Sequence, residues 1–471
     1  MLAFFKINDP LRLIILLFLM IIIRLPIWMG DIPLLSDEIH WFTLGDKLAE
    51  GNSMYVDVWD NIAPLSAGVY WVIASWFGTS QAVFFGFAAF LTLIQSYLFN
   101  LMMNRSEAYK QKTFIPGLMY LLFSNISYDF MTLSPTLISL TFLLFGLRNL
   151  LRMERTDVEQ SILNTGIFFG LASLAYMPSF SFLLMGIFAL ATFRVSSFNR
   201  LFLAFVGFTI VWGGYLVYLY YIDGLEEFAN LCILAIPDLE HNFQLTWEQM
   251  LMLAVIPAFI LLMGMFKTFS YNAFINSQQN IQQLMLIWVI TATLSIVFSS
   301  FTISYQLILY VPALSFFSAH QLLIIRKRLM AEITLWSYSL LFLALMIGTA
   351  FDVLPKKIES PYQNAWAIEV PDLNKYGDKM LVFGLDYKYY KDHNLATPYL
   401  NYNVSRQFFK KIDNYDEIRT IYNAFEKDMP DVIVDTNGDG QKLLDYITII
   451  QKKYEKVVLD NGLVIFSKVK Q

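Results

Sequence analysis

Long apolar runs separated by short polar loops are the feature that most constrains this chain. We find eleven, near residues 11–30, 81–103, 113–128, 130–147, 162–177, 178–193, 201–222, 249–266, 284–299, 304–325 and 333–351. A helix needs about 20 apolar residues to cross the hydrocarbon core of a bilayer. Only 15% of the residues are charged, whereas soluble domains carry about a quarter. The sequence therefore predicts a polytopic α-helical membrane protein with about eleven transmembrane helices.

The first apolar run could be taken for a signal peptide, because Lys6 and Arg12 precede it. However, the run from Leu11 to Gly30 is long and no small-residue cleavage site ends it. Both properties are typical of a retained first span.

Lys and Arg in the loops predict the orientation, because cytoplasmic loops are enriched in these residues. With the N-terminus in the cytoplasm, the cations fall in inside loops at residues 105–112, 148–155, 194–200, 267 and 326–328. The outside loop 31–65 has one Lys against seven acids, and the outside loop 223–248 has no Lys or Arg. We therefore expect the first loop and the C-terminus on the extracytoplasmic side.

The composition changes sharply after the last apolar run. Strand-like stretches Met380–Leu385, Asp431–Asp435 and Leu463–Phe466 alternate with helical stretches Arg406–Lys427 and Gln441–Val457. This β-α-β-α-β order is typical of a small sheet covered by helices. We expect a transmembrane domain at residues 1–352, with an external loop at 31–65, and a small C-terminal extracytoplasmic α/β domain at residues 353–471.

Cysteine, histidine and charge content exclude several kinds of site. The single cysteine, Cys232, rules out an intrachain disulfide and a thiolate metal cluster. The four histidines have no metal-ligand spacing, so we assign no metal ligands, although acidic residues can still hold a divalent cation. A net charge of −5 gives no indication of a nucleic-acid partner.

The loop at residues 31–65 holds the residues of most chemical interest. Ser36 is a good N-cap and Gly51 a good helix end, which predicts a short helix anchored at the membrane surface by Trp41. Asp37, His40, Leu44 and Lys47 share one face of that helix. The alternative is a solvated interfacial helix whose acidic first turn favours the helix dipole.

The order of features resembles the membrane-embedded GT-C glycosyltransferases, which include the protein O-mannosyltransferases and the lipid A aminoarabinose transferases. In that superfamily, the first span is followed by an acidic pair, then by a Tyr-x-Asp segment, and then by a Pro-Leu before an aromatic stretch. The matching residues are Arg24-Leu25-Pro26, Asp37-Glu38, Tyr55-Val56-Asp57, Pro64-Leu65 and Val69-Tyr70-Trp71. One departure is Ala63-Pro64, where that superfamily often has Pro-Pro.

This resemblance implies a glycosyltransferase that moves a sugar from a polyprenyl-phosphate donor to an extracytoplasmic acceptor, which is a glycan, a lipid or a protein. It also implies a bacterial inner (plasma) membrane, and membrane lipid as the second partner. The implied catalytic residues are Asp37, Glu38 and Asp129. The implied substrate-binding residues are Arg24, His40, Lys47, Tyr55, Asp57 and Asp60.

Simpler roles compete with several of these assignments. Glu38 can cap its helix, Asp129 can turn a hairpin, and Arg24 can extend its charge to the membrane surface. Two other functions also compete: a transporter or flippase of a lipid-linked sugar, and a non-catalytic GT-C-like membrane scaffold. Transporters tend to carry charges within their spans, whereas the acids here gather on one external face, which favours the enzyme.

Overall fold

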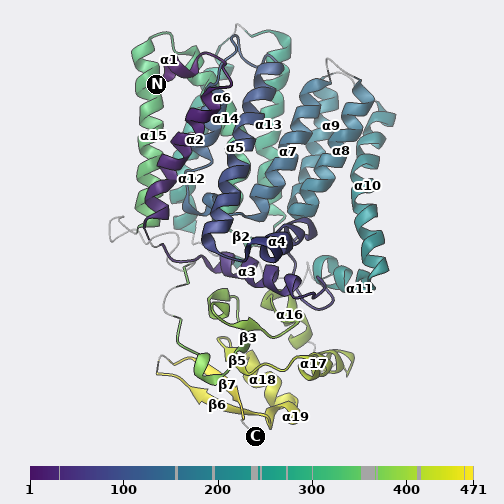
Figure 1. Cartoon of the computed structure of the whole chain (residues 1–471). Coiled ribbons are helices and arrows are strands. Elements are labelled where there is room, and N and C mark those ends of the chain that lie inside the picture. Colours follow the sequence, from purple (N-terminus) through teal and green to yellow (C-terminus); the bar gives the residue numbers. More distant parts are fainter. Residues whose placement is uncertain are drawn as a thin grey trace. The chain divides into compact units, whose positions relative to one another are not determined.

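A computed structural model of the chain (Figure 1) describes all residues except 31, 154–156, 194–196, 235–241, 244–246, 272–273, 300, 352–365, 368–369, 411–414, 461 and 470–471. Parts of the loops considered above, and the first residues of the expected C-terminal domain, lie outside the described residues. The chain forms two compact units. The first comprises Met1–Ile32, Ala82–Tyr215 and Asn242–Asn364; the second comprises Pro33–Gln81, Leu216–His241 and Ala365–Gln471.

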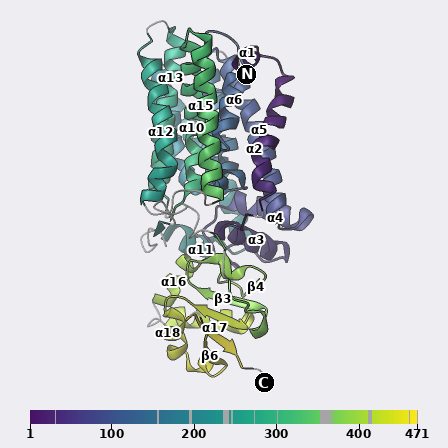
Figure 2. The same ribbon diagram turned by 90° about the vertical axis from the view of Figure 1, so that its left-hand side faces the viewer.

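The first unit is helical, and its long helices run alongside one another (Figures 1 and 2). Its elements are α1 (Leu2–Phe5), α2 (Arg12–Trp28), α5 (Gln81–Arg105), α6 (Ile115–Phe123), η1 (Tyr128–Met131), α7 (Pro135–Arg152), α8 (Val158–Ala175), η2 (Met177–Ser181), α9 (Phe182–Thr192), α10 (Phe198–Tyr221), α12 (Trp247–Phe269), α13 (Asn276–Val297), η5 (Ser304–Tyr310), α14 (Val311–Ile324) and α15 (Arg328–Ala350). The last turns of α10, from Leu216 onward, belong to the second unit. Strands β1 (Asn242–Phe243) and β2 (Phe301–Thr302) form a short parallel pair.

Each of the eleven apolar runs contains a helix. Among the described residues, six helical segments are long and apolar enough to cross a membrane, namely Gln81–Arg105, Phe198–Tyr221, Glu248–Phe269, Asn276–Val297, Ser304–Ile324 and Arg328–Ala350. Others are shorter, such as the nine residues of α6, which begins beside Pro116. The helical membrane character is thus confirmed, while the count of eleven spans stays a prediction.

Small residues allow close helix contacts in the first unit. Gly166 and Gly170 lie one turn apart on α8. A Cβ atom on Gly166 would lie 2.1 Å from the backbone oxygen of Ala204 on α10, and one on Gly207 would lie 2.3 Å from the backbone oxygen of Leu163. Such small-residue contacts are a common means of helix association in membranes.

The second unit joins the first loop to the C-terminal domain. It contains α3 (Ser36–Ala49), α4 (Pro64–Phe77), α11 (Leu225–Phe228) and η3 (Ala229–Leu234). Its C-terminal elements are η6 (Asn374–Tyr376), β3 (Lys379–Phe383), η7 (Tyr387–Tyr390), β4 (Asn394–Leu395), α16 (Tyr402–Lys410), α17 (Tyr415–Lys427), β5 (Val432–Asp435), α18 (Asp439–Tyr446), α19 (Thr448–Gln451), β6 (Tyr454–Val458) and β7 (Val464–Lys468). The loop that we expected to belong with the membrane domain therefore packs with this sheet.

The sheet has the order β4-β3-β5-β7-β6, in which β4, β3 and β5 are parallel and β7 runs antiparallel to β5 and β6. Strand β5 is buried along its whole length, which explains its unbroken apolar sequence. The small α/β domain expected from the sequence is confirmed. The single helix expected at Gln441–Val457 is wrong, because β6 takes its last residues and forms the sheet edge.

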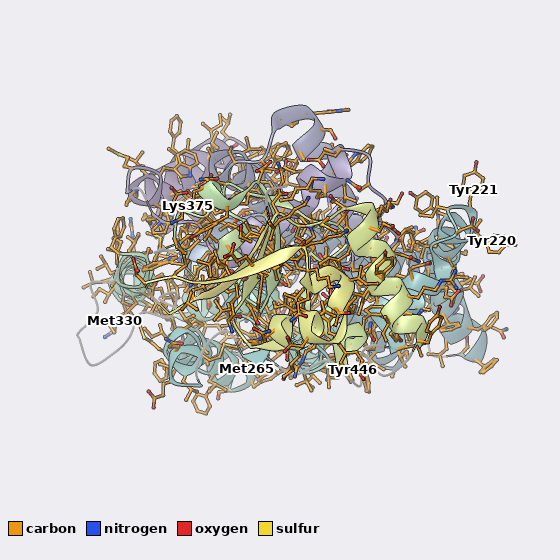
Figure 3. The ribbon with its side chains drawn as sticks, turned by 90° about the horizontal axis from the view of Figure 1, so that it is seen from below. Tyr220, Tyr221, Met265, Met330, Lys375 and Tyr446 are labelled. Carbon is orange, nitrogen blue, oxygen red and sulfur yellow. The ribbon has the colours of Figure 1, made fainter. Side chains whose placement is uncertain are left out.

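Aromatic side chains mark one end of α10. Figure 3 shows Tyr220 and Tyr221 projecting outward from that helix, and they are 74% and 85% exposed. Tyrosines at such positions are typical of the interface between lipid and water.

Candidate active site

Helix α3 begins at Ser36, one residue earlier than a Ser36 N-cap would require. Leu35 occupies the N-cap position, and its backbone N–H donates to Glu38 Oε2 at 3.0 Å. The Ser36 hydroxyl oxygen instead accepts the backbone N–H of Tyr387, at 3.1 Å. The capping role predicted for Ser36 is therefore wrong. Glu38 caps the helix instead, which is the simpler of the two roles considered for it. The helix ends beside Gly51, which has a φ of +96°.

The polar face of α3 is buried within the second unit. Asp37, His40 and Lys47 are each less than 8% exposed, and Leu44 is fully buried. This rules out the alternative of a solvated helix. Trp41 is also buried and stacks on Tyr70 with ring centroids 5.9 Å apart. Its predicted role as a membrane-surface anchor is wrong, because its ring packs inside the protein.

Asp60 connects the first loop to the C-terminal domain. Its side chain is fully buried. One carboxylate oxygen, Oδ2, lies 2.8 Å from His40 Nε2. The other, Oδ1, accepts the Asn401 side-chain amide at 2.8 Å and the backbone N–H of Asn61 at 2.7 Å. Because both oxygens are hydrogen-bonded, the buried charge of Asp60 is compensated and the imidazole of His40 is held in place.

Tyr387 completes this cluster from the C-terminal domain. Its ring stacks on His40 with centroids 4.1 Å apart and an interplanar angle of 7°. Burial raises the pKa of the Tyr387 hydroxyl well above its usual value, and the negative charges of Asp60 and Asp37 raise that pKa further. The two carboxylates thus lie close to one neutral tyrosine. Together, Asp37, His40, Asp60, Tyr387 and Asn401 form what we call the loop cluster.

Three other predicted residues of the loop bond to partners outside the loop cluster. Tyr55, at a φ of +70°, donates its hydroxyl to the backbone oxygen of Ile62 at 2.9 Å. Lys47 pairs with Glu50 at 2.7 Å. Asp57 pairs with the exposed Lys427 at 2.7 Å and accepts the Ser53 N–H at 2.9 Å.

The pKa of Asp57 reflects these contacts. Partial burial tends to raise it, but the hydrogen bonds from Lys427 and Ser53 outweigh burial and hold it below its usual value. Asp57 therefore keeps its charge over a wider pH range than an isolated aspartate.

Arg24 and Asp129 belong to the helical unit. Arg24 on α2 is 1% exposed. Its guanidinium donates to Asn125 Oδ1 at 2.7 Å, to the backbone oxygens of Phe85 and Met131 at 3.4 and 3.3 Å, and to Thr92 Oγ1 at 3.4 Å. These bonds fix the turn that leads into η1.

Asp129 lies on η1 itself. It is 1% exposed and accepts a hydrogen bond from the Ser127 hydroxyl. The turn to which Arg24 is hydrogen-bonded therefore also contains this carboxylate, and both residues belong to the first unit.

Sequence reasoning missed Tyr387 and Asn401. Asn401 lies 341 residues from its partner Asp60 along the chain, and no local motif marks either residue. The segment Tyr55-Val56-Asp57 that matched the superfamily contains Asp57 and not Asp60, whereas Asp60 is the buried member of the pair. Among the described residues, no group of three or more His, Cys, Asp or Glu side chains could hold a metal ion.

Comparison with solved structures shows which fold this is. ArnT from Cupriavidus metallidurans bound to undecaprenyl phosphate matches 98% of this chain and 99% of its own, with a TM-score of 0.61 and 11% sequence identity. The apo form of the same protein matches 97% of this chain and 98% of its own, with a TM-score of 0.59 and 11% identity. ArnT is a lipid A aminoarabinose transferase of the GT-C superfamily. The chain has the fold of ArnT.

This shared fold confirms the GT-C resemblance that the sequence indicated, over nearly the whole chain. The archaeal oligosaccharyltransferase AglB from Archaeoglobus fulgidus matches with a TM-score of 0.45 and 11% identity, over 97% of this chain and 74% of its own; that likeness is too low to carry an argument. No known sequence family and no curated protein matches the chain by sequence.

Proposed function

We propose that this chain is a glycosyltransferase that moves a sugar from a polyprenyl-phosphate carrier to an acceptor outside the cytoplasm. The observation that carries the proposal is the likeness, over 98% of the chain, to a protein whose structure holds undecaprenyl phosphate. The buried acidic face of α3 gives this fold a chemical group suited to the reaction. The acceptor is a glycan, a lipid or a protein.

The reaction requires one proton transfer and one displacement. The acceptor hydroxyl oxygen forms a bond to the anomeric carbon, and the bond from that carbon to the phosphate oxygen breaks. The polyprenyl phosphate leaves with the electron pair, and the hydroxyl proton passes to a base. We assign the base to Asp37, which lies in the first turn of α3, where the helix dipole favours an ionised carboxylate.

The remaining loop residues support Asp37. Asn401 donates to Asp60, Asp60 in turn bonds His40, and the ring of Tyr387 stacks on His40 close to the charges of Asp60 and Asp37. We propose that His40, Asp60 and Tyr387 position Asp37 and exclude water, while Tyr55, Asp57 and Lys47 shape the rest of the loop. The capping bond of Glu38 favours a structural role over the predicted catalytic one.

Arg24 is a predicted substrate-binding residue and Asp129 a predicted catalytic residue, and we keep both as proposals. The hydrogen bonds of Arg24 reach protein oxygens on three segments, which favours a part in shaping the turn before η1. We also propose that the chain has eleven transmembrane spans and lies in a bacterial inner membrane, with the loop cluster on the extracytoplasmic side.

A donor-specificity assay tests this function. Membranes containing the chain are incubated with a radiolabelled sugar on undecaprenyl phosphate, and in parallel with the same sugar as a nucleotide donor. The proposal predicts that free undecaprenyl phosphate is released, and label transferred, from the lipid-linked donor alone. Movement of the intact labelled lipid across the membrane without release of the carrier would instead support the transporter. Neither carrier release nor lipid movement would support the scaffold.

A further inference from the structure

The C-terminal domain contains a cavity that none of the functional assignments above uses. It measures about 670 Å³, which falls within the range of about 300–1,000 Å³ typical of small-molecule sites. Helix η7, the segment that joins β5 to α18 and the hairpin between β6 and β7 build its wall. The wall includes Tyr389, Asp435, Gly438, Gln441, Lys456 and Gly462.

The topology of the sheet explains the position of this cavity. Strand β5 is parallel to β3 and antiparallel to β7, and Asp435 at the end of β5 pairs with Val464 at the start of β7. The carboxyl end of β5 and the β6–β7 hairpin therefore meet at the same end of the sheet. In open α/β sheets, ligands bind outside the carboxyl ends of the parallel strands.

Asp435 makes the cavity unsuitable for an anion. Its side chain is 5% exposed. Its Oδ1 accepts the backbone N–H of Gly438 at 2.7 Å, and its Oδ2 accepts that of Gln441 at 2.9 Å. These N–H groups lie at the start of α18, where a bound phosphate would otherwise find its donors. The carboxylate thus takes the position of an anion and adds its own negative charge.

Lys456 makes the cavity unsuitable for a metal cation. Its ammonium group donates to Gln441 Oε1 at 2.9 Å, which places a positive charge at the wall. Among the described residues that line the cavity, Asp435 and Lys456 carry the only charges, one of each sign. The balance of charge favours a neutral ligand.

The groups that remain on the wall suit a sugar. The Asp435 carboxylate has about four acceptor sites, and three backbone N–H groups occupy three of them. Sugar hydroxyls can donate to the remaining site and accept from the Lys456 ammonium. The ring of Tyr389 offers an apolar surface to the C–H groups on the face of a sugar ring. We propose that this cavity binds a neutral saccharide, independently of the proposed sugar transfer.

Saturation-transfer NMR of the full chain, in a detergent without a sugar headgroup, tests the proposal. The probes are maltotriose, chitotriose and mannotriose, with the acidic trigalacturonate and the neutral peptide Gly-Ser-Gly as parallel arms. We expect saturation transfer to at least one neutral saccharide, and none to the acidic saccharide or the peptide. Absence of transfer to all three neutral saccharides, or equal transfer to the peptide or to trigalacturonate, would overturn the proposal.

Two variants connect binding to this cavity. Tyr389→Ala removes the aromatic wall and should weaken binding about three- to tenfold, the effect of one lost stacking contact. Gly438→Asn places a side chain where a Cβ atom meets nothing within 4 Å. Asn tolerates the left-handed conformation that Gly438 adopts, at a φ of +79°. This variant should therefore fold, as its melting temperature would show, and still block the cavity.

Gly51→Asn is the matched control. Gly51 also has a positive φ, +96°, and open space around its Cβ position, but it follows α3 and does not line the cavity. Its replacement should leave saccharide binding at the wild-type level. Equal weakening by Gly51→Asn and Gly438→Asn, or wild-type binding by a folded Gly438→Asn, would show that the saccharide does not bind in this cavity.

Discussion

Asp60 and Asp57 lie three residues apart but differ in their surroundings. Asp60 is fully buried and accepts hydrogen bonds from His40, Asn401 and the Asn61 backbone, whereas Asp57 faces the exposed Lys427. The sequence shows that both residues are acidic and follow a short helix. It cannot show which of them is buried, because burial of Asp60 depends on a residue 341 positions away.

This difference predicts unequal effects on stability. Asp60→Ala leaves buried donors on His40 and Asn401 without their acceptor, at a cost of about 1–3 kcal/mol for each. Asp57→Ala removes a largely exposed ion pair and should cost about 1 kcal/mol or less. Thermal unfolding of the purified variants, followed by tryptophan fluorescence, measures both. Equal melting temperatures for the two variants would show that the Asp60 network contributes little.

The Asp57–Lys427 pair also has a predictable pH dependence. The pKa of Asp57 is lowered in the folded protein, so the pair contributes fully above the ordinary aspartate pKa of about 4 and loses its effect as the pH falls through the folded value. The stability difference between the wild type and Lys427→Gln should therefore be constant from pH 7 to about pH 4 and shrink below it. A difference that changes mainly between pH 5 and pH 7 would point to another group.

At the scale of helices and strands, apolar runs predicted the helices well because hydropathy alone determines which segments can lie in lipid. The start of α3 and the edge strand β6 were predicted wrongly. Leu35 can precede α3 because Glu38 provides the capping oxygen, and Tyr454–Val458 forms a strand because β7 is available as its partner. The local sequence shows neither that Ser36 accepts a hydrogen bond from Tyr387 nor that β6 pairs with β7.

Helix packing gives an element-scale prediction. Gly166→Ala on α8 places a methyl group against the backbone of Ala204, and Gly207→Ala on α10 places one against the backbone of Leu163. Because backbone atoms cannot rotate away, each variant should force α8 and α10 apart and lose about 1–3 kcal/mol of stability. Thermal stability in detergent measures the loss.

Two further glycines of α10 provide the control. A Cβ atom on Gly213 or Gly214 meets nothing within 4 Å. Gly213→Ala and Gly214→Ala should therefore be neutral or stabilise the helix by up to about 1 kcal/mol. Losses of the same size at all four positions would argue against a specific contact between α8 and α10.

For the whole molecule, the sequence predicted a helical membrane protein with a small C-terminal sheet, and the GT-C resemblance, because these depend on composition and on the order of motifs. It did not predict that the first loop and the C-terminal domain share one compact unit. That arrangement depends on Tyr387 and Asn401, which carry no local signal.

The predicted orientation can be tested with single cysteines. After replacement of the buried Cys232 by Ser, cysteine is placed at Asn437 of the C-terminal domain or at Lys327 before α15; both positions are exposed. The Lys and Arg distribution predicts that an impermeant thiol reagent labels Asn437→Cys in intact cells, and Lys327→Cys only after lysis. Labelling of both positions from the same side would contradict the proposed topology.

The central claim is that Asp37 serves as the base in sugar transfer from polyprenyl phosphate. Transfer by Asp37→Asn, measured at matched protein abundance with the labelled lipid-linked donor, tests it most directly. Asp46→Asn, on the same helix and bonded to Thr79, is the control. Loss of a general base predicts a decrease of roughly 10²- to 10⁴-fold in the rate for Asp37→Asn, with transfer by Asp46→Asn close to that of the wild type. Transfer at the wild-type rate by a stably folded Asp37→Asn would contradict the claim.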